Sequence, residues 1–70
     1  MSYILSDMCE SSVFLEERGE IREIMKDVTR VVVDGTDAVC VDILGEQMTI
    51  QNVKFKEANL LSHGLIFERI

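Results

Sequence analysis

Few residues in this sequence could do chemistry, and their types argue against catalysis. The 70 residues include one histidine, His63, and two cysteines, Cys9 and Cys40. A catalytic nucleophile or base needs a partner group within reach, and the sequence has neither a glycine-rich phosphate loop nor the histidine spacing of a zinc protease. We therefore expect a protein that is not an enzyme.

Cys9 stands apart from the other candidates because of its neighbours. It follows Met8, precedes the acidic Glu10 and lies just before the first expected strand. The domain could begin here, with Met8 as an alternative start and residues 1–7 as an N-terminal extension. A free cysteine is most often a small buried hydrophobic residue, and this is the alternative interpretation of Cys9.

The other two candidates have simpler structural explanations. Cys40 lies between Val39 and Val41 in the middle of an expected strand, which favours a role in packing or at an interface. His63 precedes Gly64 in an expected turn, where its side chain can hydrogen-bond the backbone. A lone histidine is a weak candidate for a metal ligand.

We expect strands to position these residues, because the apolar residues are mostly aliphatic and aliphatic residues favour strands. Hydrophobic residues make up 47% of the chain, with three phenylalanines, one tyrosine and no tryptophan, and such a composition favours a core built from strands. We expect an all-β fold, a small barrel or a strongly curved antiparallel sheet of about six short strands. The expected strands cover residues 11–16, 20–25, 28–33, 38–44, 47–50, 53–56 and 65–70.

The clearest local signal is the Asp-Gly pair at residues 34–35, which suits a tight hairpin turn. In the strand that follows, alternation predicts that Val39, Val41 and Ile43 face the core. Cys40 then lies on the opposite face. A single helical turn over residues 56–61 is a weaker expectation, and closure of the sheet into a barrel would remove exposed strand edges.

The length of the chain limits what it can bury. Seventy residues form one domain, and a domain of this size buries only about 60% of the surface of its unfolded chain. Two cysteines do not make a disulfide framework. Because the apolar fraction is high and the interior small, we expect part of the apolar surface to pair with a second copy in a homodimer.

The charge balance disfavours anionic partners. The formal net charge is -6, from 13 acidic and 7 basic residues, which repels nucleic acid and anionic lipid alike. Residues 1–7 contain only a short apolar run, too short for a signal peptide or a membrane span. We expect a cytoplasmic protein with reduced thiols, formed by a single domain over residues 8–70.

Four stretches of the sequence together resemble one family. They are residues 8–15 (MCESSVFL), 24–28 (IMKDV), 42–46 (DILGE) and 59–66 (NLLSHGLI). They resemble the CooT family of small proteins associated with nickel insertion into carbon monoxide dehydrogenase, whose relatives are also labelled predicted RNA-binding proteins. The resemblance extends over residues 8–70.

The resemblance implies a β-rich homodimer in which Cys9 supplies a thiolate to one Ni(II) ion held between the subunits. One such cysteine per chain gives two thiolates per dimer, so backbone nitrogens of Met8 or Cys9 would complete the square-planar set that Ni(II) accepts. The implied partners are a nickel enzyme or its maturation factors. In the family the cysteine is the second residue and lies beside a free amino terminus, whereas here seven residues precede Met8.

An alternative function is a small RNA-binding or protein-interaction module. Small β-barrels often bind oligonucleotides through an exposed strand face. Lys54, Phe55 and Lys56 form the cluster that most resembles such a surface. The net charge and the scarcity of basic residues interleaved with aromatics argue against this alternative.

Overall fold

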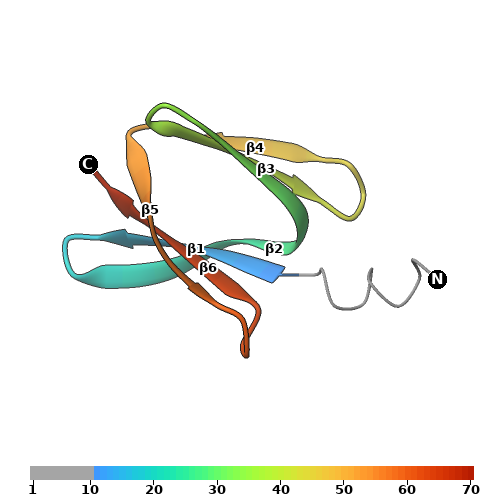
Figure 1. Ribbon diagram of the computed structural model, residues 1–70, viewed down its shortest axis with the longest axis horizontal. Helices are drawn as coiled ribbons and strands as arrows, with labels where there is room; N and C mark the ends of the chain where they lie inside the picture. Colours follow the sequence, from blue (N-terminus) through green and yellow to red (C-terminus); the bar gives the residue numbers. More distant parts are fainter. Residues whose placement is uncertain (1–10) are drawn as a thin grey trace.

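Six β-strands form most of residues 11–70, the part of the chain that the computed structural model describes (Figure 1). The strands are β1 (Ser11–Glu17), β2 (Glu20–Asp34), β3 (Asp37–Asp42), β4 (Gln47–Ile50), β5 (Val53–Asn59) and β6 (Gly64–Arg69). The expectation of an all-β fold with about six strands is confirmed. Within these residues, no helix is long and apolar enough to cross a membrane.

The strands form a single sheet in the order β4-β3-β2-β1-β6-β5. All neighbouring pairs are antiparallel except β1 and β6, which run parallel. The expected wholly antiparallel sheet is therefore wrong at this pair. The two edge strands, β4 and β5, follow one another in the chain, so the sheet must curl to bring its edges near each other.

The sheet curls without closing, so of the two expected forms, a small barrel and a strongly curved sheet, the barrel is wrong. Only Gln51 and Asn52 join the edge strands β4 and β5, and Asn52 has a positive φ of 59° that redirects the chain. The backbone N–H of Val53 then donates to the carbonyl oxygen of Thr36, in the β2–β3 turn, at 2.9 Å. Because β5 is directed to this turn, its edge does not pair with that of β4.

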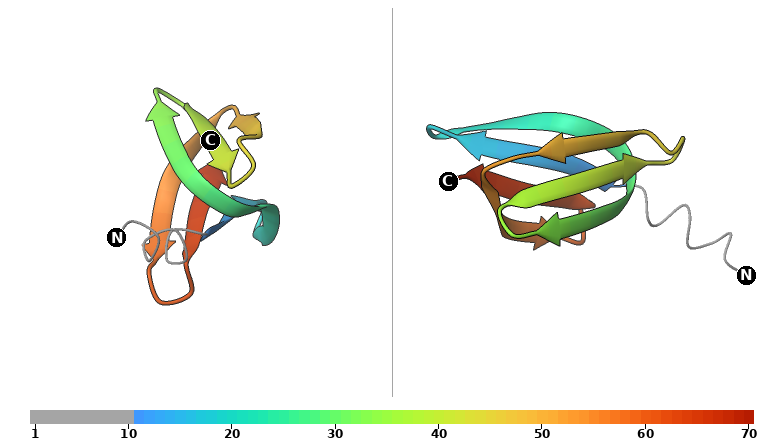
Figure 2. Two further views of the ribbon diagram at one scale, coloured as in Figure 1. Left: turned by 90° about the vertical axis from the view of Figure 1, so that its right-hand side faces the viewer. Right: turned by 90° about the horizontal axis from the view of Figure 1, so that it is seen from above.

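A bend in β2 divides the sheet into two halves. The N-terminal part of β2 pairs with β1 and its C-terminal part pairs with β3. Between them Asp27 has a positive φ of 55°, and the register shifts on both sides of this point. The two strands expected at residues 20–25 and 28–33 are thus one strand with a bulge. Figure 2 shows the curled sheet from two further directions.

The core lies inside this curl and receives side chains from every strand. Its buried apolar residues are Val13, Leu15, Val28, Ala38, Cys40, Ile50, Val53 and Phe67. The expected facing of β3 is wrong, because Ala38 and Cys40 point inward while Val39 and Val41 are only half-buried. Small side chains suit the inner face of a tightly curled sheet, where Phe67 occupies much of the space.

The register defines two ends of the sheet. Ser11 pairs with Val28, which also pairs with Asp42, so the start of β1 lies level with the end of β3. Ser12 pairs with Gly64 at the start of β6. We call this the entry end; it comprises Ser11 and the β3–β4 and β5–β6 turns, residues 43–46 and 60–63. The far end comprises the β1–β2 and β2–β3 turns and Arg69 (Figure 1).

Two turn predictions have different outcomes. The hairpin at residues 34–35 is confirmed, with Gly35 at a φ of 65° that suits glycine. The helical turn expected over residues 56–61 is wrong, because β5 continues to Asn59 by pairing with β6 around a bulge after Phe55. Cross-strand hydrogen bonds replace the local ones that a helical turn would have made.

Candidate functional site

The residues singled out for metal binding, Met8 and Cys9, lie outside the described residues. They immediately precede this part of the chain, which starts at Ser11 in β1. Ser11 is the described residue nearest to both candidate ligands in the chain, so its surroundings are described next. Ser11 lies near the start of β6, since Ser12 pairs with Gly64.

His63 lies beside the start of β1. The backbone N–H of Ser12 donates to the carbonyl oxygen of His63 at 2.9 Å, and His63 has a positive φ of 57°. His63 and Ser11 also line the same small hollow of about 100 Å³, together with Leu60 and Leu65. Local patterning could not reveal this proximity, because it depends on the parallel pairing of β1 with the distant strand β6.

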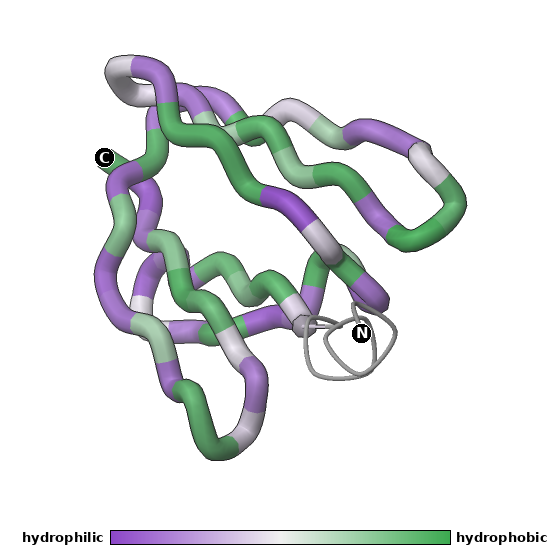
Figure 3. The backbone as a smooth tube through the Cα atoms, turned by 45° about the vertical axis from the view of Figure 1, so that its right-hand side comes forward, coloured by the Kyte–Doolittle hydropathy of each residue, from purple (hydrophilic) through white to green (hydrophobic). Residues whose placement is uncertain are grey.

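The β5–β6 turn carries two leucines into solvent. Leu60 is 81% exposed and Leu61 is 95% exposed, and Figure 3 colours the tip of the β5–β6 hairpin as hydrophobic. One side-chain oxygen holds the turn, since Asn59 Oδ1 accepts the backbone N–H groups of Leu61 and Ser62, each at 3.1 Å. The leucines are exposed on an ordered turn.

The β3–β4 turn has the same construction. Ile43 is 51% exposed and Leu44 is 81% exposed. Asp42 Oδ1 accepts the backbone N–H groups of Leu44 and Glu46, each at 2.9 Å, and the N–H of Ile43 donates to the carbonyl oxygen of Asp27 at 2.8 Å. The entry end therefore presents four exposed apolar side chains on two capped turns.

Cys40 is a packing residue. Its side chain is fully buried, and burial raises the pKa of its thiol above the ordinary value of 9.0. A protonated, enclosed thiol is neither a nucleophile nor a metal ligand. The packing role expected from the sequence agrees with this burial, although Cys40 lies on the inner face of the sheet and not on the outer one.

Residues 11–70 do not hold a metal-binding cluster of their own. Nowhere in this range do three or more histidine, cysteine, aspartate or glutamate side chains gather closely enough to hold an ion.

The possible RNA surface is neutralised by acidic neighbours. Lys54 pairs with Glu68 at 3.4 Å, and Lys56 hydrogen-bonds Glu16, which raises the pKa of Lys56. The ring of Phe55 meets Phe67 edge-on, with centroids 5.7 Å apart. Phe55 is still 49% exposed, so it is the acidic partners of the two lysines that weigh against the RNA alternative.

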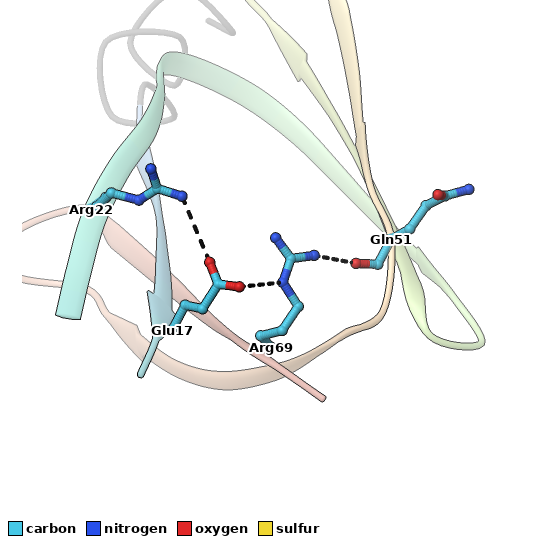
Figure 4. A network of polar contacts seen from close by, with 4 residues as sticks. All are labelled: Glu17, Arg22, Gln51 and Arg69. Atoms are coloured by element: carbon cyan, nitrogen blue, oxygen red, sulfur yellow. Dashed lines mark hydrogen bonds and ion pairs between the residues drawn. The ribbon is translucent and has the colours of Figure 1, made fainter. Parts of the chain in front are cut away.

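The far end carries a network of charged groups (Figure 4). Glu17 lies between Arg22, at 3.8 Å, and Arg69, at 3.4 Å. Arg69 also donates to the carbonyl oxygen of Gln51 at 2.6 Å. The two arginines line a hollow of about 500 Å³ whose other lining residues include Leu15, Ile24 and Met48.

Comparison with known proteins identifies one matching family model and a crystal structure with a similar fold. A family model described as CO dehydrogenase accessory protein CooT matches residues 8–68. The crystal structure assigned to CooT from Carboxydothermus hydrogenoformans is similar to this chain, with a TM-score of 0.77 and 22% sequence identity over 89% of this chain and 98% of that one. At this identity the likeness shows the fold alone. No curated protein sequence is significantly similar to the chain.

Proposed function

This chain belongs to the CooT family of CO dehydrogenase accessory proteins, and we propose that it holds Ni(II) through Cys9 at the interface of a homodimer. The observation that carries the proposal is the family match over residues 8–68, which includes Met8 and Cys9. Nickel is the cargo of the protein in this proposal, held for the maturation of a nickel enzyme. The partners would be that enzyme or its maturation factors, in the cytoplasm.

The thiol chemistry of the chain supports Cys9 as the ligand. Of the two cysteines, Cys40 is enclosed in the core and its raised pKa keeps it protonated. Thiolates and backbone nitrogens are donors that Ni(II) accepts in a square-planar set. One Cys9 per chain supplies one thiolate, so two chains with backbone nitrogens of Met8 or Cys9 would complete four donors.

An anaerobic Ni(II) titration followed by thiolate-to-metal charge-transfer absorbance tests this function. We expect saturation at about one ion per two chains, complete loss of the band in Cys9→Ala, and its retention in the matched variant Cys40→Ala. Because two thiolates must lose protons, the apparent affinity should fall about 100-fold per pH unit below the thiol pKa. Equal binding by Cys9→Ala and the unmodified chain would refute the proposal.

The seven residues before Met8 can be tested in the same assay. A chain starting at Met8 places an amino group beside Cys9, whereas the full chain offers only backbone amides there. An amine binds metal without first losing an amide proton, so we expect both chains to bind and the shortened one to bind more tightly. Absence of the band from both chains would contradict nickel binding by Cys9.

A further inference from the structure

We infer that the hollow beside β4 binds an extended peptide segment of a partner protein, which pairs with the free edge of β4 and brings an acidic side chain to Arg22 and Arg69. The inference does not depend on nickel binding by Cys9, because it rests entirely on described residues. We call this site the β4 hollow; it is lined by Leu15, Arg22, Ile24, Arg69 and residues 48–52.

The β4 hollow runs along the edge of β4. Met48, Thr49 and Ile50 all line it, although successive side chains of a strand point to opposite faces. A hollow that touches consecutive residues therefore follows the edge of the strand. On its other side β2 contributes Arg22 and Ile24, two positions apart, so one face of that strand borders the hollow.

The edge of β4 that borders the hollow is unpaired within residues 11–70. β4 stands at one end of the strand order and pairs only with β3, and no other described segment forms a backbone hydrogen bond with residues 47–50. The outward N–H and C=O groups of an edge strand are available to a further strand. The four residues of β4 extend over about 13 Å, enough for a short extended segment.

The two edge strands of the sheet differ in how they resist further pairing. β5 carries Lys54, Lys56 and Glu57 and has a bulge after Phe55, and such charges and bulges keep edge strands from adding another strand. β4 has the sequence Gln-Met-Thr-Ile, without a charged residue, a proline or a bulge. The edge of β4 is therefore open to strand addition, a recurring mode of peptide recognition.

The charge of the lining favours an acidic segment. The chain has 13 acidic and 7 basic residues, yet the β4 hollow is lined by two arginines and by no acidic residue. Guanidinium groups form strong, charge-assisted hydrogen bonds with carboxylates. An acidic side chain is thus attracted to this hollow, although the protein as a whole repels negative charge.

The contacts of the two arginines leave donors for a carboxylate (Figure 4). Arg69 is held beside the end of β4, because its Nη1 donates to the carbonyl oxygen of Gln51 at 2.6 Å and its Nε donates to Glu17 at 3.4 Å. Arg22 is less engaged: its Nη2 lies 3.8 Å from Glu17, beyond hydrogen-bond distance, and its side chain is 62% exposed. Glu17 competes with a bound carboxylate for both arginines.

Apolar side chains from both sides of the hollow define the rest of the ligand. Leu15 and Ile50 are buried, Ile24 is half-buried and Met48 is 39% exposed. In an extended segment alternate side chains share a face, so a fitting segment has an acidic and an apolar residue two positions apart. A nucleic acid or a small carboxylate lacks the amide backbone that pairs with β4, so a peptide is favoured over both.

Fluorescence anisotropy of labelled peptides with the full chain at low salt tests this inference. The probes are capped peptides of about eight residues in which valine alternates with threonine and glutamate replaces each valine in turn. A matched set carries glutamine in place of glutamate. We expect at least one glutamate peptide to bind, and its glutamine counterpart to bind about tenfold more weakly, as the loss of a charged hydrogen bond requires.

Variants of the chain locate the binding. Arg22→Gln should weaken the glutamate peptide about tenfold and leave the glutamine peptide unchanged. Arg30→Gln is the matched control, since Arg30 is exposed on β2 and does not line the hollow. Glu17→Gln removes the competing carboxylate and should tighten binding. A peptide methylated on its backbone nitrogens cannot pair with β4 and should not bind.

Several outcomes would overturn the inference. They are no binding by any peptide, equal binding of the glutamate and glutamine peptides, and equal losses in Arg22→Gln and Arg30→Gln. Acetate that competes as well as the peptide would show a carboxylate site without strand addition, and tighter binding of oligouridine would assign the hollow to nucleic acid. A change in the sedimentation of the free chain caused by Arg22→Gln would assign it to a second copy. Circular dichroism verifies the folding of each variant, and nickel binding should be unchanged in Arg22→Gln.

Discussion

The two ends of the sheet use their polar side chains differently. At the entry end, single oxygens of Asp42 and Asn59 cap turns that expose isoleucine and leucine. At the far end, Glu17 bridges Arg22 and Arg69. Both ends leave apolar side chains in water, but those of the far end are 52–66% exposed, whereas the three leucines of the entry end are at least 81% exposed.

The most exposed apolar side chains lie at the entry end. Scattered exposed apolar residues are normal on a protein surface, but Leu44, Leu60 and Leu61 are each at least 81% exposed, on two turns at opposite edges of the strand order. In the strand order β1 lies between these two turns, and it begins at Ser11, two residues after Cys9.

Replacing the cap of the β3–β4 turn should have the largest effect on stability. In Asp42→Ala the backbone N–H groups of Leu44 and Glu46 lose a charged acceptor, so we expect the free energy of unfolding to fall by about 2 kcal/mol. Urea denaturation measures this change. The conservative variant Asp42→Asn keeps an acceptor and should lose less than half as much. A loss close to zero in Asp42→Ala would show that the cap does not stabilise the turn.

Breaking the charged network at the far end should cost less. The ion pairs of Glu17 involve side chains that are more than a third exposed, and exposed pairs contribute about 0–1 kcal/mol. We expect Glu17→Gln to lower the free energy of unfolding by less than about 1 kcal/mol in low salt, and the difference to vanish in 1 M salt. A larger, salt-independent loss would mean that the network is structural.

In the interior between the two ends, the buried thiol of Cys40 should make the free energy of unfolding depend slightly on pH in the alkaline range. Burial raises the pKa of Cys40 in the folded state above its ordinary value of 9.0. The stabilisation from keeping this thiol neutral is complete below that ordinary value and is lost as the pH rises through the raised pKa. Urea midpoints measured above pH 9 should fall more steeply for the unmodified chain than for Cys40→Ala. Parallel slopes would count against the buried thiol.

Much of the fold follows from local patterns in the sequence. The remaining parts depend on contacts between distant residues, which local patterns do not show. The Asp-Gly pair fixed the turn at residues 34–35, and aliphatic segments located the strands. The parallel pairing of β1 with β6 had no local signal. In β3 both faces are apolar, so alternation alone could not reveal that the smaller side chains, Ala38 and Cys40, face inward.

The candidate site was only partly accessible from the sequence. Cys9 was distinguished by its neighbours and by the family resemblance, and its role is still a prediction. The exposed leucines of the β5–β6 turn were missed, because the pattern at residues 56–61 suggested a helical turn in place of a hairpin that exposes Leu60 and Leu61. Two adjacent leucines followed by Ser-His-Gly were the available signal, since a tight turn cannot bury both.

Native mass spectrometry of the full chain loaded anaerobically with Ni(II) tests the central claim most directly, because it weighs chains and metal together. The account predicts one species of two chains and one nickel ion, which Cys9→Ala reduces to the metal-free mass. A species with one nickel ion on a single chain, or two ions on each dimer, would contradict a shared ion between two entry ends.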